Sequence, residues 1–188
     1  MNEEELLKKA QLLFVEGKDR ESIDAFTKAI EAGADPYIAH LSRGAAHLKL
    51  KELDEAIYDF GEAIKANSKS ARAYYYRGLS YMDKNAYEKA AEDFSRALER
   101  KPGYAMAKFS RAIAYARMNK TEEASQEIMA LIPQMEENVQ AFADSYGILR
   151  TEMLKVLAQL SGDRPWPTVE LGEKEIETLK KWLKEGEN

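Results

Sequence analysis

The strongest constraint on the fold is a sequence pattern that repeats every 34 residues along most of the chain. When the chain is aligned with itself at this spacing, one column holds only small residues: Ala10, Gly44, Gly78 and Ala112. A second column holds large apolar residues: Phe26, Phe60, Phe94 and Ile128. A period of this length is typical of stacked units that cannot bury their apolar side chains alone. The chain is therefore expected to form a linear array of repeated units.

Three further columns keep the same spacing, and they indicate what each unit is. They consist of Ser22, Ala56, Ala90 and Ala124, of Ala29, Ala63, Ala97 and Leu131, and of Leu13, His47, Tyr81 and Tyr115. Small residues are expected where two helices cross closely, and large residues fill the space between neighbouring units. Each unit therefore reads as two amphipathic helices joined by a short turn. We predict helices at 3–15, 19–32, 37–50, 53–66, 70–83, 87–99, 104–117 and 121–131.

Local signals mark where some of these helices begin and end. Pro36 follows Asp35, which is a suitable N-cap, and Pro102 marks the start of another helix pair. Gly33 is well placed to stop the preceding helix. No strand pattern is needed to account for this part of the sequence, so the fold class is predicted to be all-α.

The set of columns resembles the tetratricopeptide repeat family. The third repeat matches the family pattern best, with Gly78, Tyr81, Tyr87, Ala90, Phe94, Ala97 and Pro102. The resemblance covers residues 3–136, divided as 3–36, 37–70, 71–104 and 105–136. The outer repeats depart from the pattern at Ser22, Ile128 and Leu131, which is common in end units. The resemblance implies a right-handed superhelical solenoid of four helix pairs.

The repeat pattern ends before the C-terminal segment, residues 137–188. Apolar residues three or four apart predict a long amphipathic helix at about 136–160, followed by a loop at 161–167 with Trp166. A final helix is predicted at about 173–185, with Trp182 on its apolar face. A solenoid needs a cover for its exposed end, so this segment is interpreted as a cap on the fourth repeat.

Composition limits the classes of partner. The formal charge of −5 argues against a nucleic-acid partner, since phosphate binding usually needs a basic surface. No apolar run is long enough to cross a membrane, and the N-terminus lacks the features of a signal peptide. The absence of Cys removes disulfides and thiolate chemistry, and it fits a reducing compartment. We expect a cytoplasmic protein with no membrane partner.

The sequence offers no set of residues for catalysis. His40 and His47 are the only histidines, and His47 occupies a packing column, so a metal site is not expected. No phosphate-binding loop or nucleophile motif is present. The prediction is a protein that is not an enzyme and holds no cofactor.

One charged pattern follows the repeat. Arg43, Arg77 and Arg111 share a column, and sixteen residues later Asp59, Asp93 and Glu127 share another. The first repeat has Lys9 and Ala25 at these positions. We predict a ladder of Arg–carboxylate pairs within or between the helix pairs, each contributing about 0–1 kcal/mol if exposed.

In the family that the chain resembles, the first helices of successive repeats line a concave groove that binds a peptide or helix of another protein. The corresponding residues here are Leu7, Gln11, Phe14, Leu41, Ala45, Leu48, Arg72, Tyr75, Leu79, Met82, Phe109 and Ile113. Tyr75 and Phe109 are expected to be open to the groove as contacts for an apolar ligand. The chain is thus predicted to be a protein-interaction scaffold.

The residues at the groove positions narrow the kind of ligand, and other roles for the chain remain open. One branch of the family grips acidic chaperone C-termini through Lys, Asn, Asn, Lys and Arg, and the matching positions hold Leu7, Gln11, Ser42, Arg72 and Tyr76. Only Arg72 keeps the charge, so such a clamp is not expected. Two other roles stay open: a self-associating assembly unit, whose groove holds its own or a neighbour's C-terminal segment, and a regulatory subunit of an enzyme. The protein is expected to be a monomer or a weak homo-oligomer.

Overall fold

The computed structural model describes residues 1–131, which form helices and turns without a strand. The helices are α1 (Glu3–Val15), α2 (Asp19–Glu31), α3 (Pro36–Lys49), α4 (Leu53–Ala66), α5 (Ala71–Asp83), α6 (Tyr87–Arg100), α7 (Ala105–Arg117) and α8 (Thr121–Met129). Every end lies within two residues of its prediction. The predicted capping helix at 136–160, the loop at 161–167 and the final helix at 173–185 lie outside the described residues.

The chain controls its helix ends as the sequence indicates. The Asp35 carboxylate accepts a hydrogen bond of 2.8 Å from the Ile38 backbone N–H, with Pro36 in the first turn of α3. Gly33 follows the end of α2 with φ of 88°, a left-handed conformation that favours glycine. Each turn inside a helix pair also holds one left-handed residue: Gly17, Lys51, Asn85 and Asn119.

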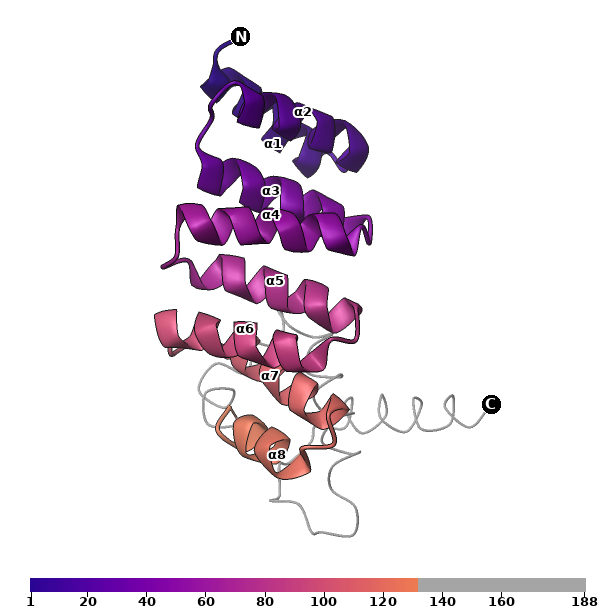
Figure 1. Ribbon diagram of the computed structural model, residues 1–188, viewed down its shortest axis with the longest axis vertical. Helices are drawn as coiled ribbons and strands as arrows, with labels where there is room; N and C mark the ends of the chain where they lie inside the picture. Colours follow the sequence, from indigo (N-terminus) through magenta and orange to yellow (C-terminus); the bar gives the residue numbers. More distant parts are fainter. Residues whose placement is uncertain (132–188) are drawn as a thin grey trace, which may run out of the picture.

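The eight helices pair as antiparallel hairpins stacked one after another, with the N-terminus at one end of the stack (Figure 1). Each first helix, α3, α5 or α7, also packs on the second helix of the preceding hairpin. This arrangement is an all-α helical repeat solenoid.

The interior is built from the repeating columns. Phe26, Phe60, Phe94 and Ile128 are fully buried. A Cβ atom placed on Gly78 would lie 2.6 Å from Cε1 of Phe94, and one on Gly44 would lie 2.9 Å from Cε1 of Phe60. The small column therefore exists because a second-helix ring lies directly against the first-helix backbone.

Candidate functional site

The first helices form the inner layer of the solenoid. Within residues 1–131, α1, α3 and α5 each contact the next first helix, whereas the second helices do not contact one another. A layer whose members lie closer together is on the inside of a curved stack. The concave face is therefore made by the first helices, as the family resemblance implies.

The prediction that Tyr75 and Phe109 are open to the groove is wrong. Tyr75 is 7% exposed and Phe109 is 5% exposed, and Leu41 in the same column is 8% exposed. The Tyr75 ring lies 5.9 Å from the Phe94 ring and 5.0 Å from the Tyr104 ring, between centroids. Tyr75 thus fills the space between the third hairpin and Tyr104 at the start of the next one, and Phe109 belongs to an apolar cluster with Ile128 and Leu131 of its own hairpin.

The accessible part of the inner face is a stripe of residues spaced seven apart on each first helix, which places them on one side. We call it the inner stripe; it consists of Ile38, Ala45, Arg72, Leu79, Met106 and Ile113. Arg72 and Ile38 are exposed, and the other four are half-buried. Four members belong to the predicted groove, whereas Ile38 and Met106 were missed. They lie 34 residues on either side of Arg72, and this shared column was the signal that could have found them.

Arg72 occupies the middle of the inner stripe and is held by an aromatic stack. Its guanidinium carbon lies 5.6 Å from the centroid of the Tyr76 ring. That ring is in turn stacked on Phe60 of α4, with centroids 5.7 Å apart and an angle of 18° between the planes. Arg72 has no ion pair with any residue of the described range. An exposed cation in contact with an aromatic ring therefore lies on a face that otherwise carries apolar side chains.

The remaining predicted groove residues line the edges of this face. Leu7, Gln11 and Phe14 on α1 are half-buried, and the Lys49 ammonium nitrogen lies 5.6 Å from the Phe14 ring centroid. Leu48 and Met82 are partly buried and pack against the main apolar core. Their exposed edges extend the apolar surface beside the inner stripe.

The predicted Arg–carboxylate ladder is present, and it ties the helices both within and between hairpins. Arg43 donates Nε and Nη2 to the two oxygens of Asp59, each at 2.8 Å, and Nη1 to Thr27 Oγ1 of the preceding hairpin at 2.9 Å. Arg77 donates to Asp93 in the same way, at 2.7 and 2.8 Å. The bidentate hydrogen bonds that Arg43 and Arg77 donate to these carboxylates raise the pKa of both guanidinium groups.

The predicted contribution of about 0–1 kcal/mol assumed that the Arg–carboxylate pairs are exposed, but the carboxylates of the second and third repeats are buried. Asp59 is 1% exposed and Asp93 is 3% exposed. Removing one member of such a pair leaves an uncompensated buried charge, which costs about 3–5 kcal/mol. The ladder is therefore a structural element of the solenoid, because the loss of either member would leave the other one charged and buried.

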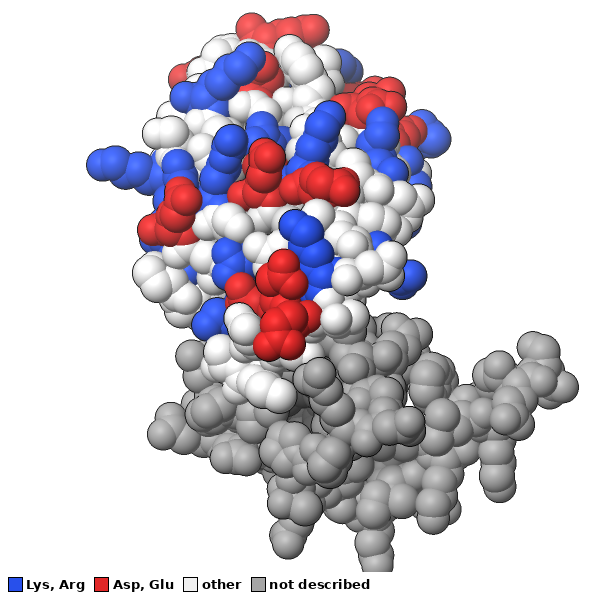
Figure 2. Space-filling model, turned by 60° about the horizontal axis from the view of Figure 1, so that its bottom comes forward, with Lys and Arg blue, Asp and Glu red and all other residues white. Residues whose placement is uncertain are grey.

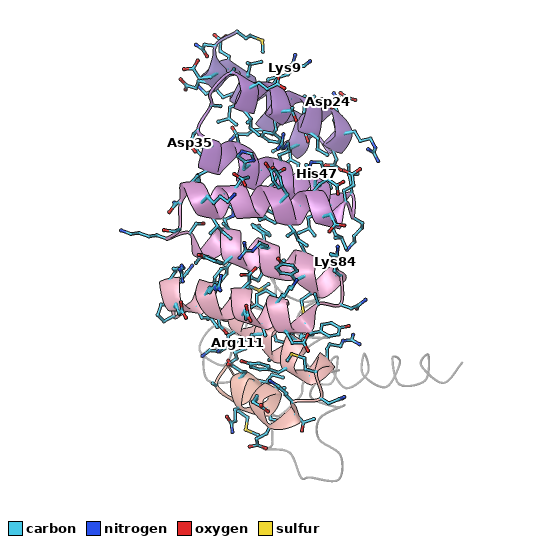
Figure 3. The ribbon with its side chains drawn as sticks, viewed as in Figure 1. Lys9, Asp24, Asp35, His47, Lys84 and Arg111 are labelled. Carbon is cyan, nitrogen blue, oxygen red and sulfur yellow. The ribbon has the colours of Figure 1, made fainter. Side chains whose placement is uncertain are left out.

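The fourth repeat makes the same pair less completely (Figure 3 labels Arg111). Arg111 donates Nη2 to Glu127 and Nη1 to Ser95 Oγ, the latter at 2.9 Å. Its Nε is buried and has no hydrogen-bond partner. In the second and third repeats an Asp accepts this hydrogen bond, so the longer Glu127 side chain does not reproduce the geometry.

Both histidines belong to the polar cluster of the second repeat. His40 Nδ1 lies 2.8 Å from Asp59 Oδ1, and His47 Nδ1 lies 2.8 Å from Glu52 Oε2. The hydrogen bond from His47 lowers the pKa of Glu52. A shallow cavity of about 290 Å³ opens beside this cluster, lined by Arg43, His47, Asp54, Glu55, Tyr58 and Asp59. Within the cavity lining, Arg43 is paired with Asp59, His47 with Glu52 and Asp54 with Lys84.

The described surface carries both signs of charge. Figure 2 shows acidic and basic side chains interspersed over the face that it displays. Among residues 1–131, no group of three His, Asp or Glu side chains is placed to hold a metal ion. No helix in this range is both long and apolar enough to span a membrane.

Comparison with known families agrees with this geometry. Tetratricopeptide repeat models match residues 7–71 and residues 71–104, which together make up more than half of the chain. The chain belongs to the tetratricopeptide repeat family. Among curated proteins, the sequence comparison finds no relative.

Several solved structures share the fold. A crystal structure of MamA aligns over 74% of this chain and 81% of that chain, with a TM-score of 0.70 and 27% identity. The first tetratricopeptide domain of Spaghetti (RPAP3), bound to the HSP90 peptide SRMEEVD, aligns over 63% of this chain and 94% of that chain (TM-score 0.59, 28% identity). The second such domain of human RPAP3, in complex with the HSP70 peptide SGPTIEEVD, aligns over 57% and 89% (TM-score 0.55, 25% identity).

Proposed function

We propose that the inner stripe binds a segment of a partner protein that carries apolar side chains around one carboxylate. The observation that supports this most is Arg72, an exposed guanidinium with no ion pair among the described residues, placed among Ile38, Leu79 and Met106. The proposed role is that of a scaffold in the cytoplasm, with no catalysis by the chain itself. The four repeats are taken to divide after residues 36, 70 and 104.

The chemistry of Arg72 favours a carboxylate as its partner. A guanidinium presents paired N–H donors that match the two oxygens of a carboxylate, and its contact with the Tyr76 ring reduces the freedom lost on binding. Apolar groups around the pair exclude water, which strengthens the attraction. The aliphatic members of the stripe would contribute by burial of their exposed area.

Structural relatives that bind peptides support this use of the concave face, since two RPAP3 domains were solved with peptide ligands. Of the five residues that would form a chaperone clamp, this chain keeps the charge of one, Arg72. We therefore propose an internal stretch of the partner as the ligand, rather than its C-terminal carboxylate.

A peptide library displayed as internal segments and selected on the full chain tests the proposal. Selected sequences should combine apolar residues with Asp or Glu, and Arg72→Glu should weaken their binding by about tenfold or more in calorimetry. Arg72 is exposed, so this change should leave the melting temperature unchanged. Tyr58→Glu is the matched control, because Tyr58 is exposed on a second helix, away from the inner stripe.

Two results would contradict the proposal. One is that the selected peptides bind Arg72→Glu as tightly as the parent; the other is that Tyr58→Glu weakens them equally. A synthetic peptide of residues 168–186 serves as a competitor. If this peptide displaces the selected ligands, the groove accepts the chain's own C-terminal segment, and the self-association alternative is preferred.

A further inference from the structure

The outer face of α1 exposes an apolar side chain, Leu12, at a position that every later repeat buries. Leu12 is 58% exposed, whereas Ala46, Ser80 and Ala114 in the same column are all 0% exposed. In α3, α5 and α7 this side of the helix packs against the second helix of the preceding hairpin. Within the described residues α1 packs only on α2 and α3. Its outer face is therefore a stacking surface that no other described helix covers.

This face is not shaped for another repeat of the same kind. Later repeats place small residues against the preceding second helix, and Leu12 is too large for that spacing. Glu5 stands in the column of Ala39, Ala73 and Ala107, which are fully buried. Lys9 stands in the column of the ladder arginines. A partner on this face must therefore lie farther from the α1 axis than a preceding repeat would, and it must accommodate the charged side chains of Glu5 and Lys9.

The charges around Leu12 are arranged so that the face complements itself. Lys8 and Glu16 lie one turn before and one turn after Leu12 on the same side of the chain, and both are exposed. Their ion pairs are local and exposed: Lys8 with Glu4 at 2.7 Å, and Glu16 with Lys18 at 2.9 Å. Such pairs contribute little and can be exchanged for others.

Two copies of α1 packed antiparallel, with their Leu12 side chains on the two-fold axis, would bring each Lys8 opposite the Glu16 of the other copy. Val15, which is 82% exposed, would flank the contact. A two-fold interface uses the same patch on both molecules, so one Lys–Glu combination supplies two pairs. Antiparallel helices also place opposite dipole ends beside each other.

We propose that the outer face of α1 is the interface of a two-fold homodimer, separate from the inner stripe. A 13-residue helix is about 20 Å long. Its contact area is smaller than that of a stable interface, so the dimer forms only at high protein concentration.

Sedimentation velocity on the full chain, from micromolar to millimolar concentration, tests the proposal through charge exchange. The parent should move from monomer toward dimer as its concentration rises. Lys8→Glu should remain monomeric, and so should Glu16→Lys, because each places like charges opposite one another. The double variant Lys8→Glu/Glu16→Lys should recover the dimer. Leu12→Gln, which removes apolar contact without touching the core, should also remain monomeric.

The alternatives give different results. A mass independent of concentration, or a double variant that stays monomeric while its far-ultraviolet circular dichroism matches that of the parent, would overturn the two-fold interface. Arg72→Glu should leave the dimer intact. If Arg72→Glu abolishes association while Leu12→Gln does not, the copies associate through the inner stripe and the proposal is wrong.

Discussion

The second and third repeats hold the same Arg–Asp pair in different surroundings. Around Asp59, His40 and Arg43 both lie at hydrogen-bond distance, and Arg43 also reaches Thr27. Around Asp93, the described partner is Arg77 alone. The difference teaches that two repeats can keep the same Arg–Asp geometry while the buried carboxylate relies on several partners in one repeat and on a single arginine in the other.

The column positions explain this difference. Where the second repeat has His40, the third has Tyr74, and the position of Thr27 is taken by Gly61. Arg77 therefore lies beside an aromatic ring, 5.7 Å from the Tyr74 centroid, where Arg43 has hydrogen-bond partners. The third repeat depends on one buried ion pair and on ring packing, whereas the second distributes its polar contacts.

The largest expected effect is on the pair itself. Arg77→Met should lower the free energy of unfolding by about 3–5 kcal/mol, because it leaves the Asp93 carboxylate buried without its partner. Arg43→Met should cost clearly less, because His40 still contacts Asp59. Urea unfolding of the two variants measures the difference. Equal losses would show that His40 contributes nothing to holding the carboxylate.

The contact between His40 and Asp59 sharpens this comparison. Combining Arg43→Met with His40→Ala should increase the loss of unfolding free energy toward that of Arg77→Met, because the nearest remaining cationic side chain at Asp59 is then His47, with Nε2 at 3.8 Å. Urea unfolding of the double variant measures this increase. A loss no larger than that of Arg43→Met alone would contradict the role given to His40.

The two small-column glycines offer an intermediate effect. Gly78→Ala places a Cβ atom 2.6 Å from a fully buried Phe94 ring, and overpacking of this kind costs about 1–3 kcal/mol. Gly44→Ala meets Phe60 at 2.9 Å, so a smaller shift relieves it, and alanine favours the helix over glycine by about 1 kcal/mol. Thermal unfolding should show a lower melting temperature for Gly78→Ala and little change for Gly44→Ala.

The periodic columns made the fold predictable. A period of 34 residues together with small and large apolar columns determines the hairpins, and caps such as Asp35 determine their ends. The Arg–carboxylate ladder was predictable for the same reason, since acids recur with bases at a constant distance. Its burial was not, because spacing alone does not show how much of a side chain the neighbouring hairpin covers.

The open side of the first helices was also harder to predict. Leu41, Tyr75 and Phe109 form an apolar column, and apolar side chains suit a groove or a seam between repeats equally. The column of Ile38, Arg72 and Met106 mixes charge with apolar groups, which a buried seam would not tolerate. The column that holds apolar residues in each of these repeats is buried. The column that holds an arginine in one repeat and apolar residues in the others lies on the accessible face.

The smallest expected effect concerns the turns inside the hairpins. Lys51 and Asn85 occupy the same column, with φ of 60° and 58°. The left-handed conformation costs a residue with an unbranched apolar stem roughly 1 kcal/mol, whereas Asn adopts it more readily. Lys51→Gly should therefore raise the free energy of unfolding by at most about 0.5 kcal/mol, after subtraction of the roughly 0.5–1 kcal/mol of entropy that glycine adds to the unfolded chain.

Asn85→Gly should gain less or lose slightly, because it also removes the 2.6 Å hydrogen bond that Asn85 accepts from the Tyr87 hydroxyl. The lost Lys51–Asp83 ion pair is exposed and contributes at most about 1 kcal/mol, so Lys51→Met serves to separate its effect. Met removes the charge but keeps an unbranched side chain at this position, so its difference from the parent measures the ion pair. If Lys51→Gly and Asn85→Gly change stability equally, the side chain at this turn position does not set the strain. The left-handed conformation would then cost the same free energy at Lys51 and at Asn85.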